Sequence, residues 1–331
     1  MLARRAGVAV LAFAVLVIVL LASLALGSVD IDPLRVIGAL FAFDGSQDHL
    51  IVRDIRVPRT MVGLAAGASL GISGAMLQAL TRNPLAEPGI LGINAGAALA
   101  VVAGIAVFGV ADAGGYVWFA LIGAALAALA VTALGSVGRR GATPITLIIA
   151  GAVLAAMLAS ITSAVLVLDA ATLDRYRFWI IGSIAGRELD VLAVIAIPVT
   201  VGILIGLGSA RALNGLALGD DVARSLGIRL TTVRVFGFAA AVLLAGGAVA
   251  AAGPIVFVGL AVPHAARLVV GPDWRWIVPL SGVLGPVLLL GADVLGRLIA
   301  RPGELQVGVI TALIGAPLFV SLVRRQRLAE L

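Results

Sequence analysis

The sequence predicts an all-α membrane protein, a polytopic bundle of about ten transmembrane helices. Of its 331 residues, 62% are hydrophobic and only 12% are charged, and the mean hydropathy is +1.18. Soluble domains are nearer half apolar and about a quarter charged. The 41 glycines favour helices that approach one another closely in lipid. Long unbroken apolar runs, rather than short alternating segments, indicate helices.

Ten apolar runs are long enough to span a bilayer, since roughly 20 helical residues cross its hydrocarbon core. The first follows "MLARR", a basic start like that of a signal peptide, but its apolar stretch is too long for one, so we expect a retained helix. All ten belong to one transmembrane domain over residues 1–331. They lie at about 8–27, 60–80, 89–109, 116–136, 143–167, 189–209, 231–251, 255–270, 276–297 and 305–323.

The arginines orient the bundle, because cytoplasmic segments of membrane proteins are enriched in basic residues. With the N-terminus inside and ten crossings, 14 of the 23 arginines face the cytoplasm, including Arg139 and Arg140. The "RRQR" stretch at 324–327 then lies inside too, so both termini are predicted to be cytoplasmic. The basic balance therefore reflects orientation in a membrane, and no soluble basic face points to a nucleic acid.

Composition excludes several kinds of site. The chain has no cysteine and two histidines, so we expect no metal site and no bound cofactor. It has no lysine, which a P-loop requires, so we expect no ATPase site in this chain. Two scattered histidines supply neither a nucleophile–base pair nor a metal site, so we do not expect an enzyme. An ion-coupled secondary transporter is a remote alternative, because such proteins place acids or histidines within the membrane and no acid sits in the middle of a run.

Residues 60–97 and 237–271 resemble each other as an apolar helix, a proline-containing break and a second apolar helix. In the predicted topology their first helices cross in opposite directions, which indicates an inverted repeat. The break after the second run is either a tight turn between packed helices or part of a gate. The mildly polar residues that we assign to the translocation path or its gate are Ser69, Ser73, Gln78, Asn83, Pro84, Ser160 and Ser163.

Two polar segments suggest contact with partners. Between the sixth and seventh runs, Gly219 and Gly227 bracket a stretch able to form a short helix with a small apolar face, which lies either on the membrane or against another protein. On the predicted outer side, "VRDIRVPRT" at 52–60 retains three arginines against the usual charge rule. These arginines form either a solvated rim or a docking site for an acidic partner.

Five ordered motifs resemble the iron-siderophore and vitamin B12 permease family of bacterial ABC importers. They are "GAMLQALTRNPLAEPGILGINAGA" at 74–97, "RFWIIGSIAG" at 177–186, "LALGDDVARSLGI" at 216–228, "GPIVFVGLAVPHAARLVVGPDWRW" at 253–276 and "GADVLGRLIARPGELQVGVITALIGAPLFVSLV" at 291–323. The "PDWRW" stretch departs from relatives, which usually carry a histidine before the arginine. Several motifs look most like ferric enterobactin-type permeases, with cobalamin or haem import as the alternative.

The resemblance implies a type II ABC importer permease fold, a location in the bacterial cytoplasmic (inner) membrane and a set of partners. These are a second permease subunit, identical or paralogous, two cytoplasmic ATPases that bind ATP and Mg²⁺, and a periplasmic or lipoprotein binding protein that delivers a ferric siderophore. It implies a cytoplasmic coupling segment at about 210–230 that seats on the ATPase, and outer arginines that meet glutamates of the binding protein. The coupling residues are Leu218, Gly219, Asp220, Asp221, Ala223, Arg224, Leu226 and Gly227, and the docking residues are Arg56, Arg59 and Arg297.

Overall fold

The computed structural model describes residues 2–110, 112–136 and 144–329, and in these ranges every regular element is a helix. Ten helices correspond one to one with the ten predicted apolar runs. Arg139 and Arg140 lie outside the described residues. The ten helices are α1 (Leu2–Ala25), α4 (Val57–Thr81), α5 (Ile93–Phe108), α6 (Ala113–Ser136), α7 (Pro144–Leu168), α9 (Asp190–Ala217), α11 (Leu230–Ala252), α12 (Val258–Val270), α13 (Trp274–Ile299) and α14 (Val307–Ala329).

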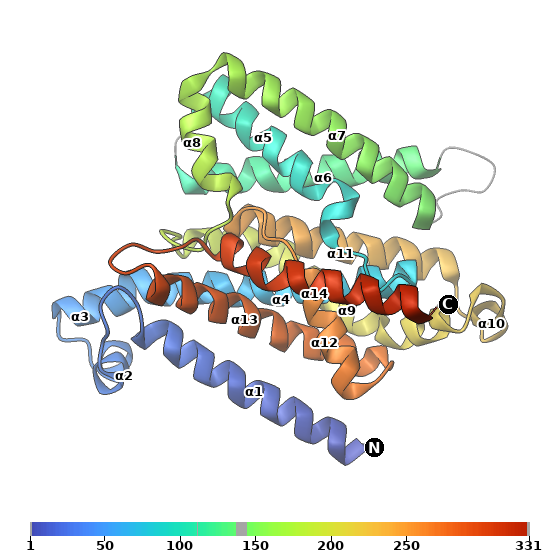
Figure 1. Ribbon diagram of the computed structural model, residues 1–331, viewed down its shortest axis with the longest axis horizontal. Helices are drawn as coiled ribbons and strands as arrows, with labels where there is room; N and C mark the ends of the chain where they lie inside the picture. Colours follow the sequence, from blue (N-terminus) through green and yellow to red (C-terminus); the bar gives the residue numbers. More distant parts are fainter. Residues whose placement is uncertain (1, 111, 137–143, 330–331) are drawn as a thin grey trace.

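Seven segments of the described chain are long and apolar enough to cross a membrane, and α5, α12 and the apolar part of α14 are shorter apolar helices. The start of α1 and the end of α14 lie at the same end of the bundle as α10 (Asp220–Ser225), as Figure 1 shows. The two ends of a chain lie at the same end of a bundle when the chain runs through it an even number of times. We call this the α10 end, and the opposite end the outer end.

Four short elements at the outer end escaped the sequence prediction. They are α2 (Pro33–Phe41), α3 (Gln47–Leu50), the π-helix η1 (Ile51–Arg56) and α8 (Ala170–Ile180). Asp32 caps α2 by accepting a hydrogen bond from Leu34 N, and Asp169 caps α8 in the same way. Short, half-polar helices of this kind lack a long apolar run, so the search for membrane spans passes over them.

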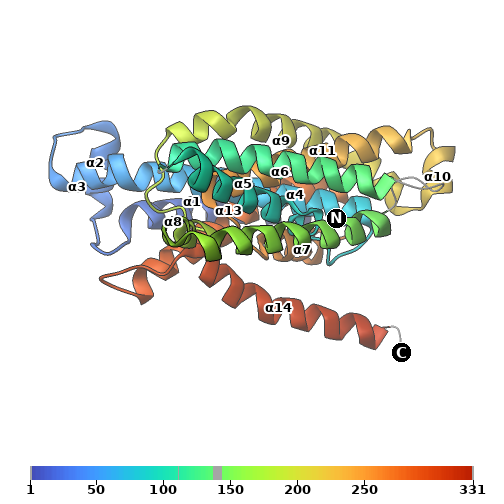
Figure 2. The same cartoon turned by 90° about the horizontal axis from the view of Figure 1, so that it is seen from above.

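Helix α4 is the central axis of the bundle, packed against α9, α11, α12 and α13 (Figures 1 and 2). Glycines allow its backbone to approach its neighbours closely. A Cβ atom at Gly74 would lie 1.8 Å from the carbonyl oxygen of Gly259, and one at Gly67 would lie 2.6 Å from Pro286. Helices α5–α8 form a separate layer above this centre in Figure 1. Figure 2 shows α14 projecting away from the rest.

The two helix–break–helix units run in opposite directions, as an inverted repeat requires. Helix α4 runs from the outer end to the α10 end, and α11 runs back. The breaks that follow them, residues 82–92 and 253–257, meet inside the bundle. Phe257 N donates a 2.6 Å hydrogen bond to Glu87 Oε1, across 170 residues of sequence. Phe257 adopts a left-handed conformation with φ of 68°, an unfavourable region for a bulky residue.

Candidate functional site

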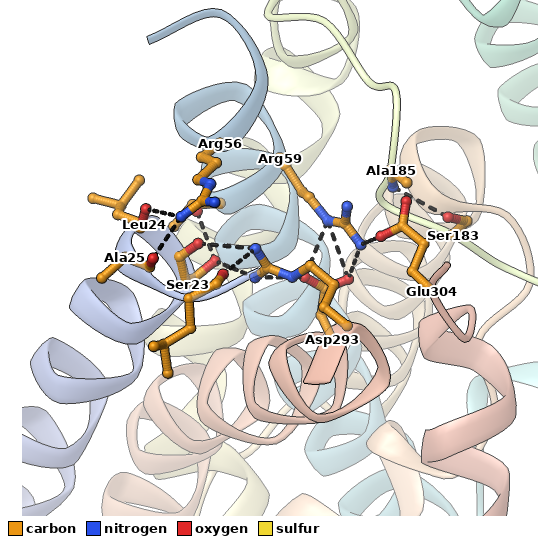
Figure 3. Close-up of polar contacts among 12 residues, drawn as sticks. Ser23, Leu24, Ala25, Arg56, Arg59, Ser183, Ala185, Asp293 and Glu304 are labelled. Atoms are coloured by element: carbon orange, nitrogen blue, oxygen red, sulfur yellow. Dashed lines mark hydrogen bonds and ion pairs between the residues drawn. The ribbon is translucent and has the colours of Figure 1, made fainter. Parts of the chain in front are cut away.

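At the outer end, a cavity of about 370 Å³ is lined by three arginines and a glutamate. Arg56 comes from η1, Arg59 from the first turn of α4, Arg297 from the last turn of α13, and Glu304 from the segment before α14. Figure 3 shows Arg56 and Arg59 side by side, with Glu304 and Asp293 around Arg59. We call this site the arginine cavity. It brings together all three predicted docking residues.

Asp293 joins two of the arginines below the cavity. Arg59 Nη2 lies 2.7 Å from Asp293 Oδ1, and Arg297 Nη2 lies 3.0 Å from Asp293 Oδ2. Arg59 Nη2 also lies 2.7 Å from Glu304 Oε2. Asp293 is almost fully buried, whereas the Glu304 side chain is 43% exposed. Arg59 is therefore shared between one carboxylate fixed inside the protein and one at the surface.

Arg56 and Arg297 are held by backbone carbonyls near the end of α1. Arg56 donates to the carbonyl oxygens of Leu24, Ala25 and Val29. Arg297 Nη1 donates to those of Ser23 and Leu26 at 3.1 and 2.8 Å. The last carbonyls of a helix have no partner within the helix and carry partial negative charge, so guanidinium groups suit them.

Of the two alternatives for the outer arginines, a solvated rim does not fit Arg56 and Arg59, which are buried, and the docking role stays a prediction. Arg56, Arg59 and Arg297 are only 5, 7 and 4% exposed. A charged group is buried in a protein only when partners replace its water, and here carbonyls and Asp293 do so. Arg53 and Arg301 are exposed at this end instead, with Arg53 over the Phe43 ring and Arg301 paired with Asp30. Hydrogen bonding to Arg301 lowers the pKa of Asp30.

At the α10 end, a short helix presents apolar side chains outward. Leu218, Val222 and Leu226 are 63, 45 and 61% exposed, whereas Ala223 is fully buried against the bundle. The predicted apolar face therefore comprises Val222 and Leu226 with Leu218, and Ala223 holds α10 in place. Gly219 precedes the helix at φ of 104°, a conformation that only glycine adopts readily.

Asp220 ties α10 to two transmembrane helices. Its carboxylate lies 2.8 Å from Arg234 Nη2 on α11 and also pairs with Arg82, the residue that ends α4. Arg82 Nε donates to Leu216 O at 2.9 Å. The hydrogen bonds from Arg234, and next from Arg82, lower the pKa of Asp220. By contrast, Asp221 is exposed and pairs only locally with Arg224, at 2.8 Å.

The residues predicted for the translocation path fall into three groups. Ser69, Ser73 and Gln78 are buried in the packed centre, where Ser73 Oγ donates to Ala241 O and Gln78 Nε2 to Leu260 O. In the described structure these three side chains are enclosed by neighbouring helices, and Ser69 Oγ and Gln78 Oε1 have no hydrogen-bond partner there. Their assignment to the translocation path stays a prediction. Ser160 and Ser163 are exposed on α7. Asn83 and Pro84 are partly buried in the break, where Asn83 Oδ1 accepts from Leu85 N.

Sequence reasoning missed three acids. Asp293 and Glu304 belong to the arginine cavity, and Glu87 joins the two breaks. The i, i+4 spacing of Asp293 and Arg297 on a predicted helix could have indicated their pairing. The other partnerships span 170 residues or more, and no local pattern indicates them. In the described part of the chain, no group of three or more metal-binding side chains occurs.

The model of the FecCD transport family matches residues 15–325. The ferric enterobactin transport system permease protein FepD of Escherichia coli (strain K12) is 45% identical, covering 94% of this chain and 93% of FepD. The cobalamin import system permease protein BtuC of Halobacterium salinarum is 40% identical, covering 86% of this chain and 76% of BtuC. A solved metal-chelate type ABC transporter in an inward-facing conformation superimposes with a TM-score of 0.82 at 27% identity, over 96% of this chain and 99% of that one.

Fold and similarity together define a multi-pass membrane permease subunit of an ABC importer. The chain belongs to the FecCD transport family.

Proposed function

We propose that this chain forms the membrane channel through which a ferric siderophore enters the cell, with separate ATPase subunits supplying the energy. The observation that carries this proposal is the 45% identity to FepD over nearly the whole of both chains. Relatives named for hydroxamate and ferric citrate import are 40% and 39% identical. A catecholate chelate of the enterobactin type is therefore the first substrate to test.

The arginine cavity supports docking of a binding protein at the outer end. Its guanidinium groups are pre-positioned by carbonyls and Asp293, so little side-chain freedom is lost when a carboxylate enters. Arginine suits this role because its planar group can bond both oxygens of a carboxylate. The partner that fits is a binding protein with a glutamate or aspartate on a protruding surface.

Helix α10 supports docking of an ATPase at the α10 end, which then faces the cytoplasm. Three exposed apolar side chains at one small site need a partner surface to shield them from water. The pairs from Asp220 to Arg82 and Arg234 connect this site to the ends of α4 and α11. A movement of the ATPase would therefore reach the transmembrane helices through these pairs.

The exposed face of α7 supports a path between two copies of the permease. Ser160 and Ser163 lie on this face among apolar residues such as Ile161 and Val153. A neutral, mildly polar wall suits a bulky chelate, because a bare cation requires rings of carboxylates or carbonyls. The second copy, identical or paralogous, would supply the opposite wall.

Reconstitution tests the proposed function directly. The chain is incorporated into proteoliposomes with an ABC ATPase and a binding protein of the same organism. Uptake of radiolabelled iron as ferric enterobactin, a ferric hydroxamate or ferric citrate is compared with and without ATP. We expect ATP-dependent uptake of a ferric chelate. Uptake that proceeds without the ATPase, or that follows an ion gradient, would contradict the proposal.

Cobalamin import is the second candidate, and the 40% identity to BtuC of Halobacterium salinarum favours it. The same proteoliposomes distinguish the two, because labelled cobalamin can replace the ferric chelate. Accumulation of cobalamin without uptake of any ferric chelate would select this alternative.

A further inference from the structure

We propose that Glu304 is an internal substitute for the binding protein's carboxylate, and that docking displaces it from Arg59. This inference rests on the proposed function, because it requires a binding protein at the outer end. The proposed function has a carboxylate of the binding protein bind the arginines. The inference adds that Glu304 of the permease competes with that carboxylate. The argument depends on the charge balance of the arginine cavity, on the exposure of its two acids and on the segment that carries Glu304.

The cavity needs an anion besides Asp293. Three guanidinium groups face two carboxylates, Asp293 and Glu304. Removal of Glu304 leaves three positive charges opposite one negative charge around a hollow of about 370 Å³. Arg297 also retains a buried Nε–H without a hydrogen-bond partner in the described structure. Because Glu304 is 43% exposed, water reaches the mouth of the cavity, and positive charge there attracts a carboxylate with the modest strength of a part-exposed ion pair. A vacated cavity therefore favours an acidic side chain of a partner.

Of the two acids, only Glu304 can leave. Asp293 is 1% exposed and is held by both Arg59 and Arg297. The side chain of Glu304 is 43% exposed, and among the described residues it forms an ion pair only with Arg59, at 2.7 Å. Ion pairs at such exposure contribute little to stability, because water replaces the lost partner. Glu304 can therefore rotate into solvent while the buried network stays intact.

Release of Glu304 would affect the segment that leads into α14. Its segment, residues 300–306, joins α13 to α14 and is also held by the pair between Arg301 and Asp30. Leu305 N donates to Gly296 O on α13, and Gly308 N donates to Gly182 O beyond the end of α8, both at 3.1 Å. Docking that frees Glu304 would remove one of the contacts that hold this segment, while the backbone hydrogen bonds on either side of it remain.

Equilibrium binding of the binding protein to the complete reconstituted complex tests the competition. Glu304→Gln removes the competing charge while keeping the size of the side chain. Glu188→Gln is the matched control, since it removes one exposed negative charge from the loop between α8 and α9. We expect Glu304→Gln to tighten binding by about threefold, the scale of a competing half-exposed ion pair. Glu188→Gln should change affinity much less.

Equal effects of the two variants would overturn the inference, because general charge would then explain both. Weaker binding of Glu304→Gln would overturn it too, since Glu304 would then be a contact with the partner. If the wild-type complex shows no association with any binding protein, the proposed function and this inference both fail.

A label on the segment provides a second measurement that does not depend on affinity. Because the chain has no cysteine, Gly303→Cys introduces a single thiol beside Glu304. Residue 303 is exposed, so the measurement is the mobility of a spin label attached to this thiol rather than its access to solvent. We expect Glu304→Gln to raise the mobility of the label in the absence of the binding protein. Equal mobility with and without Glu304→Gln would overturn the inference.

Discussion

The two ends of this permease present opposite kinds of surface. The arginine cavity buries charged groups and satisfies them internally, leaving one exposed acid at its mouth. Helix α10 exposes apolar side chains, while the carboxylate of Asp220 pairs with an arginine of a transmembrane helix. The outer end is thus suited to recognise charge, and the α10 end to recognise shape and hydrophobicity. Mutations should therefore affect outer docking in a salt-dependent way and inner docking in a largely salt-independent way.

The largest expected effect is at the α10 end. Leu226→Arg places a charge where we propose that an apolar side chain enters the ATPase, so transport should fall by at least about tenfold, given about 1.5–3 kcal/mol for burial of one leucine. ATP-driven uptake in proteoliposomes measures this. Leu226→Met keeps the apolar contact and should retain most uptake. Equal uptake by the arginine variant and wild type would remove α10 from the coupling role.

Among effects on folding stability rather than on transport, the largest is expected at the buried pair below the arginine cavity. Arg59→Ala leaves Asp293 charged and only partly compensated, which should destabilise the protein by about 3–5 kcal/mol. The double variant Arg59→Ala with Asp293→Ala should recover part of this loss. Thermal unfolding of the purified protein in detergent measures both. If the losses of the two single variants simply add, the pair is not coupled.

The contact between the breaks at 82–92 and 253–257 should make a contribution of intermediate size to stability. Glu87→Ala removes the acceptor for Phe257 N and leaves that amide unpaired, at a cost of about 1–3 kcal/mol. Glu87→Gln retains an acceptor oxygen and is the control. Hydrogen exchange of the Phe257 amide should accelerate only in the alanine variant. Exchange that is unchanged in both variants would show that Glu87 does not hold the break.

Asp220→Asn should weaken the attachment of α10 by about 0.5–1 kcal/mol, the scale of part-exposed ion pairs. The folded-state pKa of Asp220 is lowered, so its contribution is complete above the unfolded-state pKa and is lost as pH falls through the folded-state value. Hydrogen exchange in α10 should therefore separate wild type from variant at neutral pH, with the difference vanishing in strong acid. A difference that persists there would assign the effect to packing.

The smallest effect should come from Arg53→Glu, an exposed position outside the cavity. Reversal of this charge should slow association of an acidic binding protein by a few-fold and should leave dissociation nearly unchanged. Association rates at low and high salt measure it. An effect that does not shrink with salt would contradict a steering role.

The sequence alone predicts the ten apolar helices and the position of α10, because hydrophobic length and flanking glycines are local signals. The resemblance to the permease family selects Arg56, Arg59 and Arg297 as a group, but does not indicate their burial. The partners of these arginines come from α1, α13 and the segment before α14, which only the fold brings together. For the same reason Ser69 and Ser73 resemble path residues in sequence while lying in the packed centre.

The close glycine contacts of α4 tie its spacing to that of two neighbouring helices. Because a single methyl group at Gly74 or Gly67 would collide with the backbone of α12 or α13, the present separation of these helices requires glycine at both positions. A transport cycle must either carry α4, α12 and α13 together or separate these backbones. Paired spectroscopic labels on α4 and α12, or on α4 and α13, would tell which of the two occurs.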